Sequence, residues 1–210
     1  FPNVTREIHI CNDHNSGGSA HILEVMFCEP KRAISFNNTA EYYSTTFSSL
    51  SEITVSIWVK TGANVNSQRI IDFTATGNTG IRTTSTGFVR FLVDGNASSL
   101  GPQLTADTWY NFTLILKDGD SKLFLDGQLE ATSADPFTGS TGFEIGDSVG
   151  TFSLDGTYDE IALFSSALTD QEVRSLWNGG GMIQATHPSL ISYWAFEDNN
   201  YKTFYSTPDA

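Results

Sequence analysis

Paired carboxylates are the residues whose spacing would reveal a glycosidase. Hydrolysis of a glycosidic bond needs two of them about 5 to 10 Å apart across a groove, one a protonated acid and the other ionised. Glu144 and Asp147 are separated by an odd number of positions, so alternation along a strand turns them to opposite faces. The adjacent Asp159 and Glu160 fail for the same reason. The sequence therefore predicts that the chain is not an enzyme, because a function must be argued from a site.

The sequence also lacks the residue patterns typical of nucleophilic catalysis. The four histidines stand at positions 9, 14, 21 and 187, and no Gly-x-Ser-x-Gly elbow is present to expose a serine. A glycine-rich phosphate loop ending in Lys-Ser or Lys-Thr is also missing from the sequence. These patterns favour a binding module over a catalytic domain.

Cys11 and Cys28 are the only cysteines, and three interpretations of them remain open. The first is a disulfide that staples an N-terminal hairpin in an extracellular protein. The second is a pair of reduced, buried thiols. The third is zinc held by Cys11, His9, His14 and either His21 or Cys28, because thiolate and imidazole suit a tetrahedral site, although the spacing matches no established zinc signature.

Exposed aromatic side chains beside Asn, Asp or Gly are the usual contacts for a sugar. The ring stacks on C–H faces while neighbouring polar groups bond the hydroxyls. Four aromatics are candidate ligand contacts on this basis: Tyr42, Tyr43, Phe137 in the loop 134–142, and Tyr158. The alternative is that each of them fills the rim of a core.

The charge balance limits the partners. With 24 Asp and Glu against 11 Lys and Arg, the net charge is −13. This disfavours nucleic acid and anionic membrane surfaces, because both need clustered basic residues. No apolar run reaches the roughly 20 residues of a spanning helix, so no membrane insertion is expected. The apolar fraction of 39%, with 15 Phe, 7 Tyr and 4 Trp, is still enough for a sizeable core.

The candidate site residues must be positioned by the secondary structure of the chain. Short apolar stretches between turn signals indicate that this structure is all-β. In 53–60, Ile and Val alternate with mostly polar residues, as in a strand with one buried face. Asp-Gly pairs begin at positions 94, 118, 126 and 155, and this dipeptide suits tight hairpins. Antiparallel pairing follows, because parallel strands need crossovers that the sequence does not supply. Further strands are predicted at 69–75, 87–94, 109–117, 121–126 and 158–164.

One short helix is predicted over about 170–178. Thr169 caps it, Glu172 closes a capping box three residues later, and Gly179 ends it. The helix is expected to lie across the sandwich and to seal an end of the core, since its apolar residues fall on one stripe. These residues are Val173, Leu176 and Trp177.

Three segments, in order, resemble one family. The family is that of laminin-G-like, pentraxin-related modules of the concanavalin A-like lectin and glucanase superfamily. The signature of these modules resembles residues 152–180, FSLDGTYDEIALFSSALTDQEVRSLWNGG. Their opening strands resemble ISFNNTAEYYSTTFSSLSEITVSIWVKT (34–61), and their central hairpins resemble TWYNFTLILKDGDSKLFLDGQ (108–128). The resemblance covers roughly residues 31–180. It implies an antiparallel two-sheet jelly-roll sandwich, concanavalin A-like, with one short C-terminal helix.

The same resemblance implies a structural Ca²⁺ that pins the opening strand to the Asp-Glu-Ile strand. Its ligands would be carboxylate, amide and carbonyl oxygens, which suit calcium. Carried over by motif, Asp159 is the first candidate ligand and Asn37 the second, with Asn38 as an alternate. The alternative for Asp159 is a hydrogen bond to the backbone, which is common for Asp beside turns.

Three regions are predicted along the chain. Residues 1–30 match the family poorly and are interpreted as an N-terminal arm or extra hairpin, and residues 31–186 as the sandwich. Residues 187–210 resemble the stretch that follows such modules in tail and adhesion proteins of bacterial viruses and in bacterial surface proteins. They are either a final strand folded back onto the sandwich or the beginning of a further module.

The resemblance and the missing catalytic motifs together predict a non-enzymatic recognition module. It would bind a glycan or a protein on a cell or particle surface, as part of a virion appendage or an extracellular adhesin, alone or as a homo-oligomer within a larger assembly. One alternative is a purely structural decoration or spacer domain of a virus particle. Another is an accessory carbohydrate-binding module of a larger enzyme.

Overall fold

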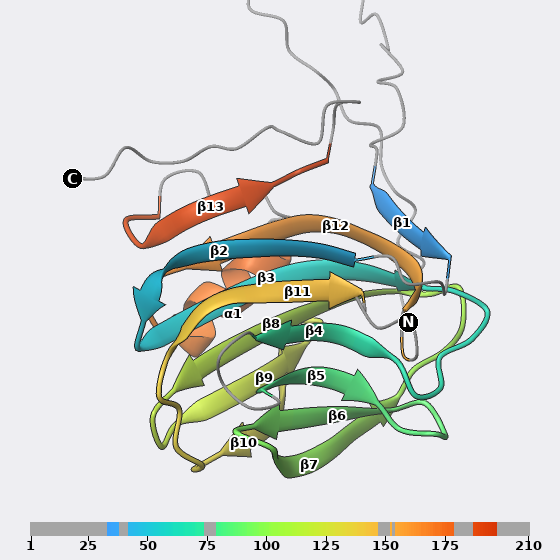
Figure 1. Ribbon diagram of the computed structural model, residues 1–210, viewed down its shortest axis with the longest axis horizontal. Helices are drawn as coiled ribbons and strands as arrows, with labels where there is room; N and C mark the ends of the chain where they lie inside the picture. The colour runs from blue at the N-terminus through green and yellow to red at the C-terminus, as the bar shows by residue number, and fades with distance from the viewer. Residues whose placement is uncertain are drawn as a thin grey trace, which may run out of the picture.

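The computed structural model describes residues 33–37, 42–73, 79–146, 152, 154–178 and 187–196. These residues form a sandwich of two antiparallel sheets with one helix outside it, which confirms the predicted fold class (Figure 1). The seven-stranded sheet has the order β1-β12-β3-β8-β9-β10, with β13 also paired to β12. Its strands are β1 (Ile34–Asn37), β3 (Glu52–Thr61), β8 (Trp109–Lys117), β9 (Ser121–Leu125), β10 (Gln128–Ser133), β12 (Asp155–Phe164) and β13 (Leu190–Trp194).

The six-stranded sheet has the order β2-β11-β4-β5-β6-β7. Its strands are β2 (Tyr42–Leu50), β4 (Arg69–Phe73), β5 (Thr79–Thr83), β6 (Phe88–Val93), β7 (Asn96–Gln103) and β11 (Ser140–Gly146). The predicted apolar strands are all present, with ends that differ by a few residues. The sequence patterns did not single out β5, β7 and β11, because these strands are rich in Gly, Ser and Thr.

The core lies between the two sheets and follows from strand alternation. In β3 the residues Ile53, Val55, Ile57 and Val59 are each at most 1% exposed, and they face Phe143 and Ile145 of β11 within one apolar cluster. The opposite side chains of each strand form an outer face. The helix covers the outer face of the seven-stranded sheet, whereas the outer face of the six-stranded sheet carries charged side chains.

Three of the four Asp-Gly pairs lie in hairpins as predicted, the pair at 118 being the one between β8 and β9. Asp94 and Gly95 join β6 to β7, and Asp126 and Gly127 join β9 to β10, with φ positive at all four residues. A type I′ turn requires this backbone conformation. The pair at 118 turns with positive φ at Gly119 only. The prediction is wrong for Asp155-Gly156, which lies inside β12.

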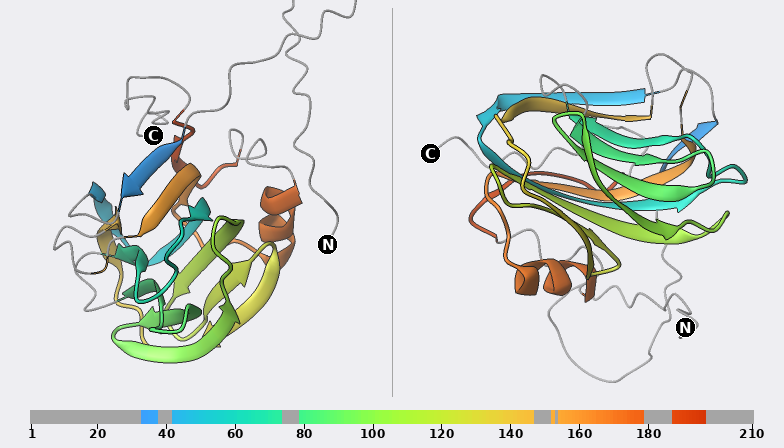
Figure 2. Two further views of the ribbon diagram at one scale, coloured as in Figure 1. Left: turned by 90° about the vertical axis from the view of Figure 1, so that its right-hand side faces the viewer. Right: turned by 90° about the horizontal axis from the view of Figure 1, so that it is seen from below.

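Helix α1 (Asp170–Asn178) has the predicted bounds and cap. The backbone N–H and hydroxyl of Thr169 donate to Glu172 Oε2 over 2.6 and 2.7 Å. Its position differs from the expectation, because it covers the outer face of the seven-stranded sheet and not an end of the core (Figure 2). The reason is a second apolar cluster, in which Val173 and Leu176 pack on outward residues of β8, β9 and β12: Ile115, Phe124, Ala162 and Phe164.

Residues 190–194 form a strand of this sandwich, since β13 pairs with β12 from Ile161 to Phe164. Several predictions fall outside the described residues: the arm 1–30 with Cys11 and Cys28, Asn38, the helix end at Gly179, and the tail after 196. Within the described residues, no helix has the length and apolar character needed to cross a membrane.

Candidate functional site

Two of the four aromatics named from the sequence are buried. Tyr158 is 0% exposed, its hydroxyl donates to the carbonyl of Ile70 over 2.8 Å, and its ring packs edge-on against Phe36. Phe137 is 4% exposed and belongs to the core. The prediction that these two contact a ligand is wrong, because the core occupies their faces.

Tyr42 and Tyr43 are neighbours on β2 and turn to opposite sides. Tyr43 is half-buried and packs edge-on against Trp194, with ring centroids 6.4 Å apart. Burial raises the pKa of the Tyr43 phenol. Tyr42 is 51% exposed on the outer side of β2. Of the four predicted aromatics, Tyr42 alone has a side chain open to a partner.

The two predicted calcium ligands Asn37 and Asp159 stand at different levels of the pairing between β1 and β12. Strand register sets Asn37 opposite Asp155, while Asp159 lies four residues further along β12. That is a separation of about 13 Å at 3.3 Å per residue, whereas calcium binds its oxygens at about 2.3–2.6 Å. Asp159 is also buried, and its Oδ1 accepts the Glu160 N–H over 2.9 Å. The described residues contain no group of three or more His, Cys, Asp or Glu that could hold a metal, and the calcium ligand set stays a prediction.

Among the described residues, the acidic side chains considered above form no acid and base pair at an open cleft. Asp159 and Glu160 are both buried, and a bulge gives Glu160 a left-handed φ of 51°. Glu144 of β11 does lie directly opposite Asp72 of β4. However, Asp72 is engaged by arginines on its other side, as described below.

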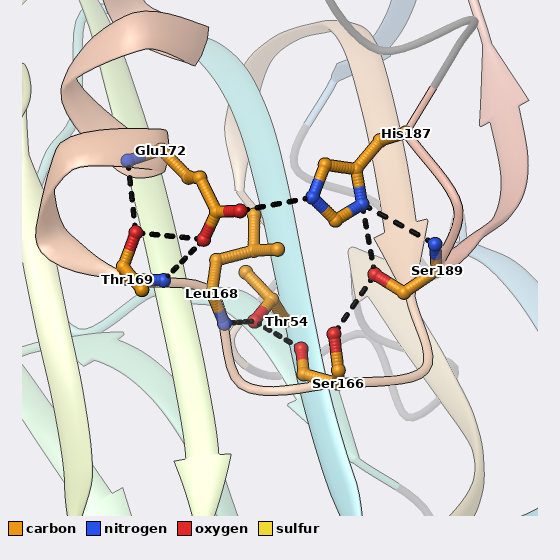
Figure 3. A network of polar contacts seen from close by, with 7 residues as sticks. All are labelled: Thr54, Ser166, Leu168, Thr169, Glu172, His187 and Ser189. Carbon is orange, nitrogen blue, oxygen red and sulfur yellow. Dashed lines mark hydrogen bonds and ion pairs between the residues drawn. The ribbon is translucent and has the colours of Figure 1, made fainter.

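A serine, a histidine and a glutamate do come together beside helix α1 (Figure 3). His187 Nε2 lies 3.2 Å from Glu172 Oε1, and His187 Nδ1 lies 2.9 Å from Ser189 Oγ. The Ser189 N–H also donates to Nδ1, which places the ring proton on Nε2, where it is donated to Glu172.

These three residue types also occur in hydrolytic triads, but here their hydrogen bonds connect structural elements to one another. Ser189 Oγ also accepts the hydroxyl of Ser166 over 2.8 Å, and the His187 ring packs on Phe164. The Glu172 carboxylate caps the helix through Thr169, and this contact is the main reason why its pKa is lowered. The network thus ties the start of α1 to the turn before β13, and its serine is committed to that turn.

The unexpected cluster is a row of three arginines on the outer face of the six-stranded sheet. Arg69 of β4 lies directly opposite Arg82 of β5, which lies directly opposite Arg90 of β6. These are three of the six arginines in a chain of net charge −13. Like charges directly opposite one another on neighbouring strands destabilise a sheet. The row therefore needs a compensating group.

Asp72 supplies part of that compensation. It accepts the Arg82 fork through Oδ1 and Oδ2, both 3.1 Å from Nη2, and its Oδ2 lies 3.3 Å from Arg69 Nε. Burial raises the pKa of Asp72, and the two guanidinium groups offset this rise in part. Arg90 is exposed, and within the part of the chain that the structure describes it forms no ion pair. Positive charge therefore exceeds negative charge at the β6 end of the row.

The row borders a hollow of about 210 Å³. Phe152 forms one wall and is 42% exposed, with the Arg69 guanidinium 5.7 Å from its ring centroid. Gln68 also lines the hollow and is 2% exposed, and neither its Nε2 nor its Oε1 has a hydrogen-bond partner among the described residues. Buried amides are normally paired, so this one is a candidate for a ligand contact. Hydroxyl groups complete the lining: Ser67, Thr83, Thr84 and Ser85.

The local backbone holds this lining in place. The β5–β6 hairpin is fixed by the Thr84 hydroxyl, which accepts the N–H groups of Thr86 and Phe88. Across from it, the Gln68 N–H donates to the Thr83 hydroxyl over 2.8 Å, and the preceding Ser67 has a left-handed φ of 54°. Strained residues of this kind persist only where surrounding contacts fix them, and they concentrate at functional sites.

The sequence analysis did not predict this site, because the net charge of −13 gave no indication that three arginines lie together. One signal was present: the hairpin 79–93 carries Arg82 and Arg90 at matching distances from its turn, both at outward positions. Arg69 could not be added without the register of β4, and Phe152 reaches the hollow from a distant part of the chain.

Solved structures with the same fold are similar to this chain at low sequence identity. A protein of Bacteroides ovatus whose proposed role is carbohydrate binding has 19% identity and a TM-score of 0.64, with 80% of this chain and 52% of that chain covered. Trypanosoma rangeli sialidase has 17% identity and a TM-score of 0.60, with 72% and 28% covered. A heptameric pentraxin of Limulus polyphemus has 17% identity and a TM-score of 0.51, with 71% and 77% covered. The chain thus spans about half of the first protein and about a quarter of the sialidase.

The family is shown by the sequence itself. No curated protein matches the chain significantly. The Laminin_G_3 family, described as the concanavalin A-like lectin/glucanases superfamily, matches residues 36–174, about two thirds of the 210 residues. With its two antiparallel sheets and its helix after β12, the chain belongs to the concanavalin A-like lectin/glucanases superfamily.

Proposed function

We propose that the chain is a non-enzymatic carbohydrate-binding module whose ligand occupies the hollow on the outer face of the six-stranded sheet. The observation that carries the proposal is one hollow that holds both an exposed aromatic ring, Phe152, and the buried amide of Gln68, which has no partner among the described residues. A sugar needs both, an apolar surface for its C–H face and polar groups for its hydroxyls.

The family and the fold neighbours support this reading. Many folds of this type carry different functions, so the site must bear the argument. The carbohydrate-binding role proposed for the Bacteroides ovatus protein agrees with it, while the sialidase, of which the chain spans only 28%, gives no reason to assign hydrolysis.

The chemistry of the site also favours binding over hydrolysis. A glycosidase needs one carboxyl held protonated and a second held ionised, both facing the substrate. Asp72 is bound to Arg69 and Arg82, and neither Asp72 nor Glu144 lines the hollow. The hollow offers hydroxyl, amide and guanidinium groups, which position a ligand without cleaving it.

The wider setting is part of the proposal. We place the module on an extracellular or virion surface, in an appendage or adhesin, where a glycan of a cell or particle is its partner.

A structural calcium between β1 and β12 is also part of the proposal. Asp155 is the acidic residue in register with Asn37, and it is the better first candidate than Asp159. A melting temperature that is equal with calcium and with chelator would argue against it.

A glycan array tests the proposed function. The 210-residue chain should retain at least one class of saccharide, and Phe152→Ala should abolish that binding. Phe88→Ala is the matched control, because Phe88 is 37% exposed on the same sheet but does not line the hollow. Equal binding by both variants, or no binding by the parent chain, would contradict the proposal.

A further inference from the structure

We infer that the arginine row, Arg69, Arg82 and Arg90, binds the carboxylate or sulfate group of an acidic saccharide in the adjoining hollow. The inference rests on the proposed function, since it names the class of carbohydrate that the module takes. Three independent observations lead to it: the register of the row, the environment of Arg90, and the unpartnered amide beside it.

The register is the first observation. Strand pairing places three guanidinium groups on adjacent strands at one level of the sheet. Such an arrangement destabilises the free protein, because like charges lie directly across from each other. An oxyanion between the strands would remove the repulsion, since a guanidinium fork matches a carboxylate or sulfate with two parallel hydrogen bonds.

The distribution of acidic groups is the second observation. Carboxylates lie toward the β11 side of this face, with Glu144 on β11 and Asp72 on β4. Asp72 draws Arg69 and Arg82 together and fixes their orientation. Arg90, at the other end of the row, forms no ion pair with any described residue. A ligand anion at this end would therefore meet positive charge that the protein does not itself neutralise.

The buried amide is the third observation. Gln68 is almost fully enclosed, and its Nε2 and Oε1 lack partners among the described residues. Leaving such groups unpaired is unfavourable, and a ligand that both donates and accepts hydrogen bonds would relieve it. A saccharide with hydroxyl groups next to its acidic substituent supplies both. A bare inorganic anion supplies acceptors only, so it could satisfy the row and Gln68 Nε2 but would leave Gln68 Oε1 without a donor.

The size of the hollow limits the ligand. At about 210 Å³ it is smaller than the roughly 300 to 1,000 Å³ of typical ligand pockets. It therefore accommodates one sugar residue, and the remainder of a chain would extend over the face. Phe152, at its edge, provides the surface on which that sugar ring would stack.

The test is titration calorimetry of the complete chain with three probes: a galacturonate oligosaccharide, a chondroitin sulfate oligosaccharide and a neutral dextran oligosaccharide. At least one acidic probe should bind, the neutral probe should not, and affinity should fall as salt rises. Arg90→Gln should weaken binding about tenfold or more, since a charge-assisted contact is lost. The exposed Arg174→Gln on helix α1 is the matched control and should bind as the parent chain does.

Arg90→Lys separates charge from geometry. Lysine keeps the positive charge but lacks the planar fork, so binding should be weakened yet remain stronger than in Arg90→Gln. Equal affinity of Arg90→Gln and the parent chain for an acidic probe would overturn the inference. So would failure of both acidic probes to bind.

The outcomes also distinguish this inference from the proposed function. Binding of neutral saccharides that depends on Phe152 but not on Arg90 would retain the carbohydrate module and reject the anion site. A site that binds inorganic sulfate through Arg90, in a chain that binds no saccharide, would reject the carbohydrate module, and with it the acidic saccharide.

Discussion

The two outer faces of the sandwich follow the same alternation of side chains but differ in what they carry. On the seven-stranded sheet, outward residues such as Ile115, Phe124 and Phe164 are apolar and lie beneath helix α1. On the six-stranded sheet, outward residues such as Arg69, Arg82 and Arg90 are charged and border a hollow. The difference indicates that one face stabilises the fold, while the other, without a covering helix among the described residues, carries the site that we propose for recognition.

Polar residues sharpen the contrast. Under the helix side, the buried Thr54 is fully used: its hydroxyl donates to the Ser166 carbonyl over 2.8 Å and accepts the Leu168 N–H over 3.1 Å. On the opposite face, Gln68 is equally buried, yet its amide has no partner among the described residues. Polar groups that serve only the fold are satisfied internally, as is usual in protein interiors. Gln68 departs from that pattern at the hollow.

The largest expected effect comes from truncating the helix-covered face. Phe164→Ala should reduce the free energy of unfolding by about 3–5 kcal/mol, because it empties a fully buried site between β12 and α1. Phe88→Ala, the same change on the exposed face, should cost less than about 1 kcal/mol. Urea denaturation measures both. Similar losses for the two variants would remove the distinction between the faces.

The next effect concerns the turn beneath the helix. Gly127 has a φ of +73°, and an added Cβ would lie 3.1 Å from the Trp177 ring. Gly127→Ala should therefore cost about 2–3 kcal/mol, from backbone strain and crowding together. Gly119 is the control, because its φ is +68° with nothing within 4 Å, so Gly119→Ala should cost only the strain, about 1 kcal/mol. Equal losses in denaturation would show that Trp177 does not press on this turn.

Acid should weaken the helix-covered face through Glu172. Its pKa is lowered in the folded state, first by the Thr169 backbone N–H and then by the Thr169 hydroxyl and His187. Stability from this group is therefore present above its ordinary pKa of 4.5 and is lost as pH falls through the lower folded value. Urea midpoints between pH 6 and pH 3 should fall less steeply for Glu172→Gln than for the parent chain. Glu130→Gln, at an exposed position on β10, should follow the parent curve.

The smallest expected effect is a gain in stability on the charged face. Arg90→Gln removes one of two opposed arginines, so the ligand-free protein should become more stable by about 0.2–1 kcal/mol. The gain should shrink in concentrated salt, which screens the repulsion. A loss of stability in Arg90→Gln would mean that Arg90 serves the fold, and the contrast between the faces would fail there.

Much of the fold could be predicted from the sequence because its signals are local. Strand β8 and helix α1 have the predicted bounds, since β8 is a largely apolar run between turns and α1 has a capping box at Thr169 and Glu172. Strands such as β7, NASSLGPQ, lack such signals and owe their pairing to β6. The location of the helix also needed the tertiary structure, because its apolar stripe does not say which surface it will cover.

The candidate site was much less predictable. An aromatic ring such as that of Tyr158 looks the same in sequence whether it reaches solvent or fills the core, and the structure buries it. The acidic residue that pairs with Asn37 depended on the register of β1 against β12, which the motif does not give. The arginine row depended on the register of three strands at once. Chemistry that arises from pairing between strands is invisible until the pairing is known.

The arrangement of β1 and β13 along β12 has a consequence for the chain as a whole. Trp194 ends β13 opposite Ile161, and Ile34 begins β1 opposite Tyr158, so the two strands run in the same direction, one after the other (Figure 1). Together β13 and β1 occupy the place of one interrupted strand beside β12. The end of β13 therefore lies near the beginning of β1, and the path from β1 to β13 nearly closes into a ring. A circularly permuted protein that runs from Trp194 through a short linker into Ile34, and opens at the exposed Gly119 turn, would keep every strand pair of the sandwich.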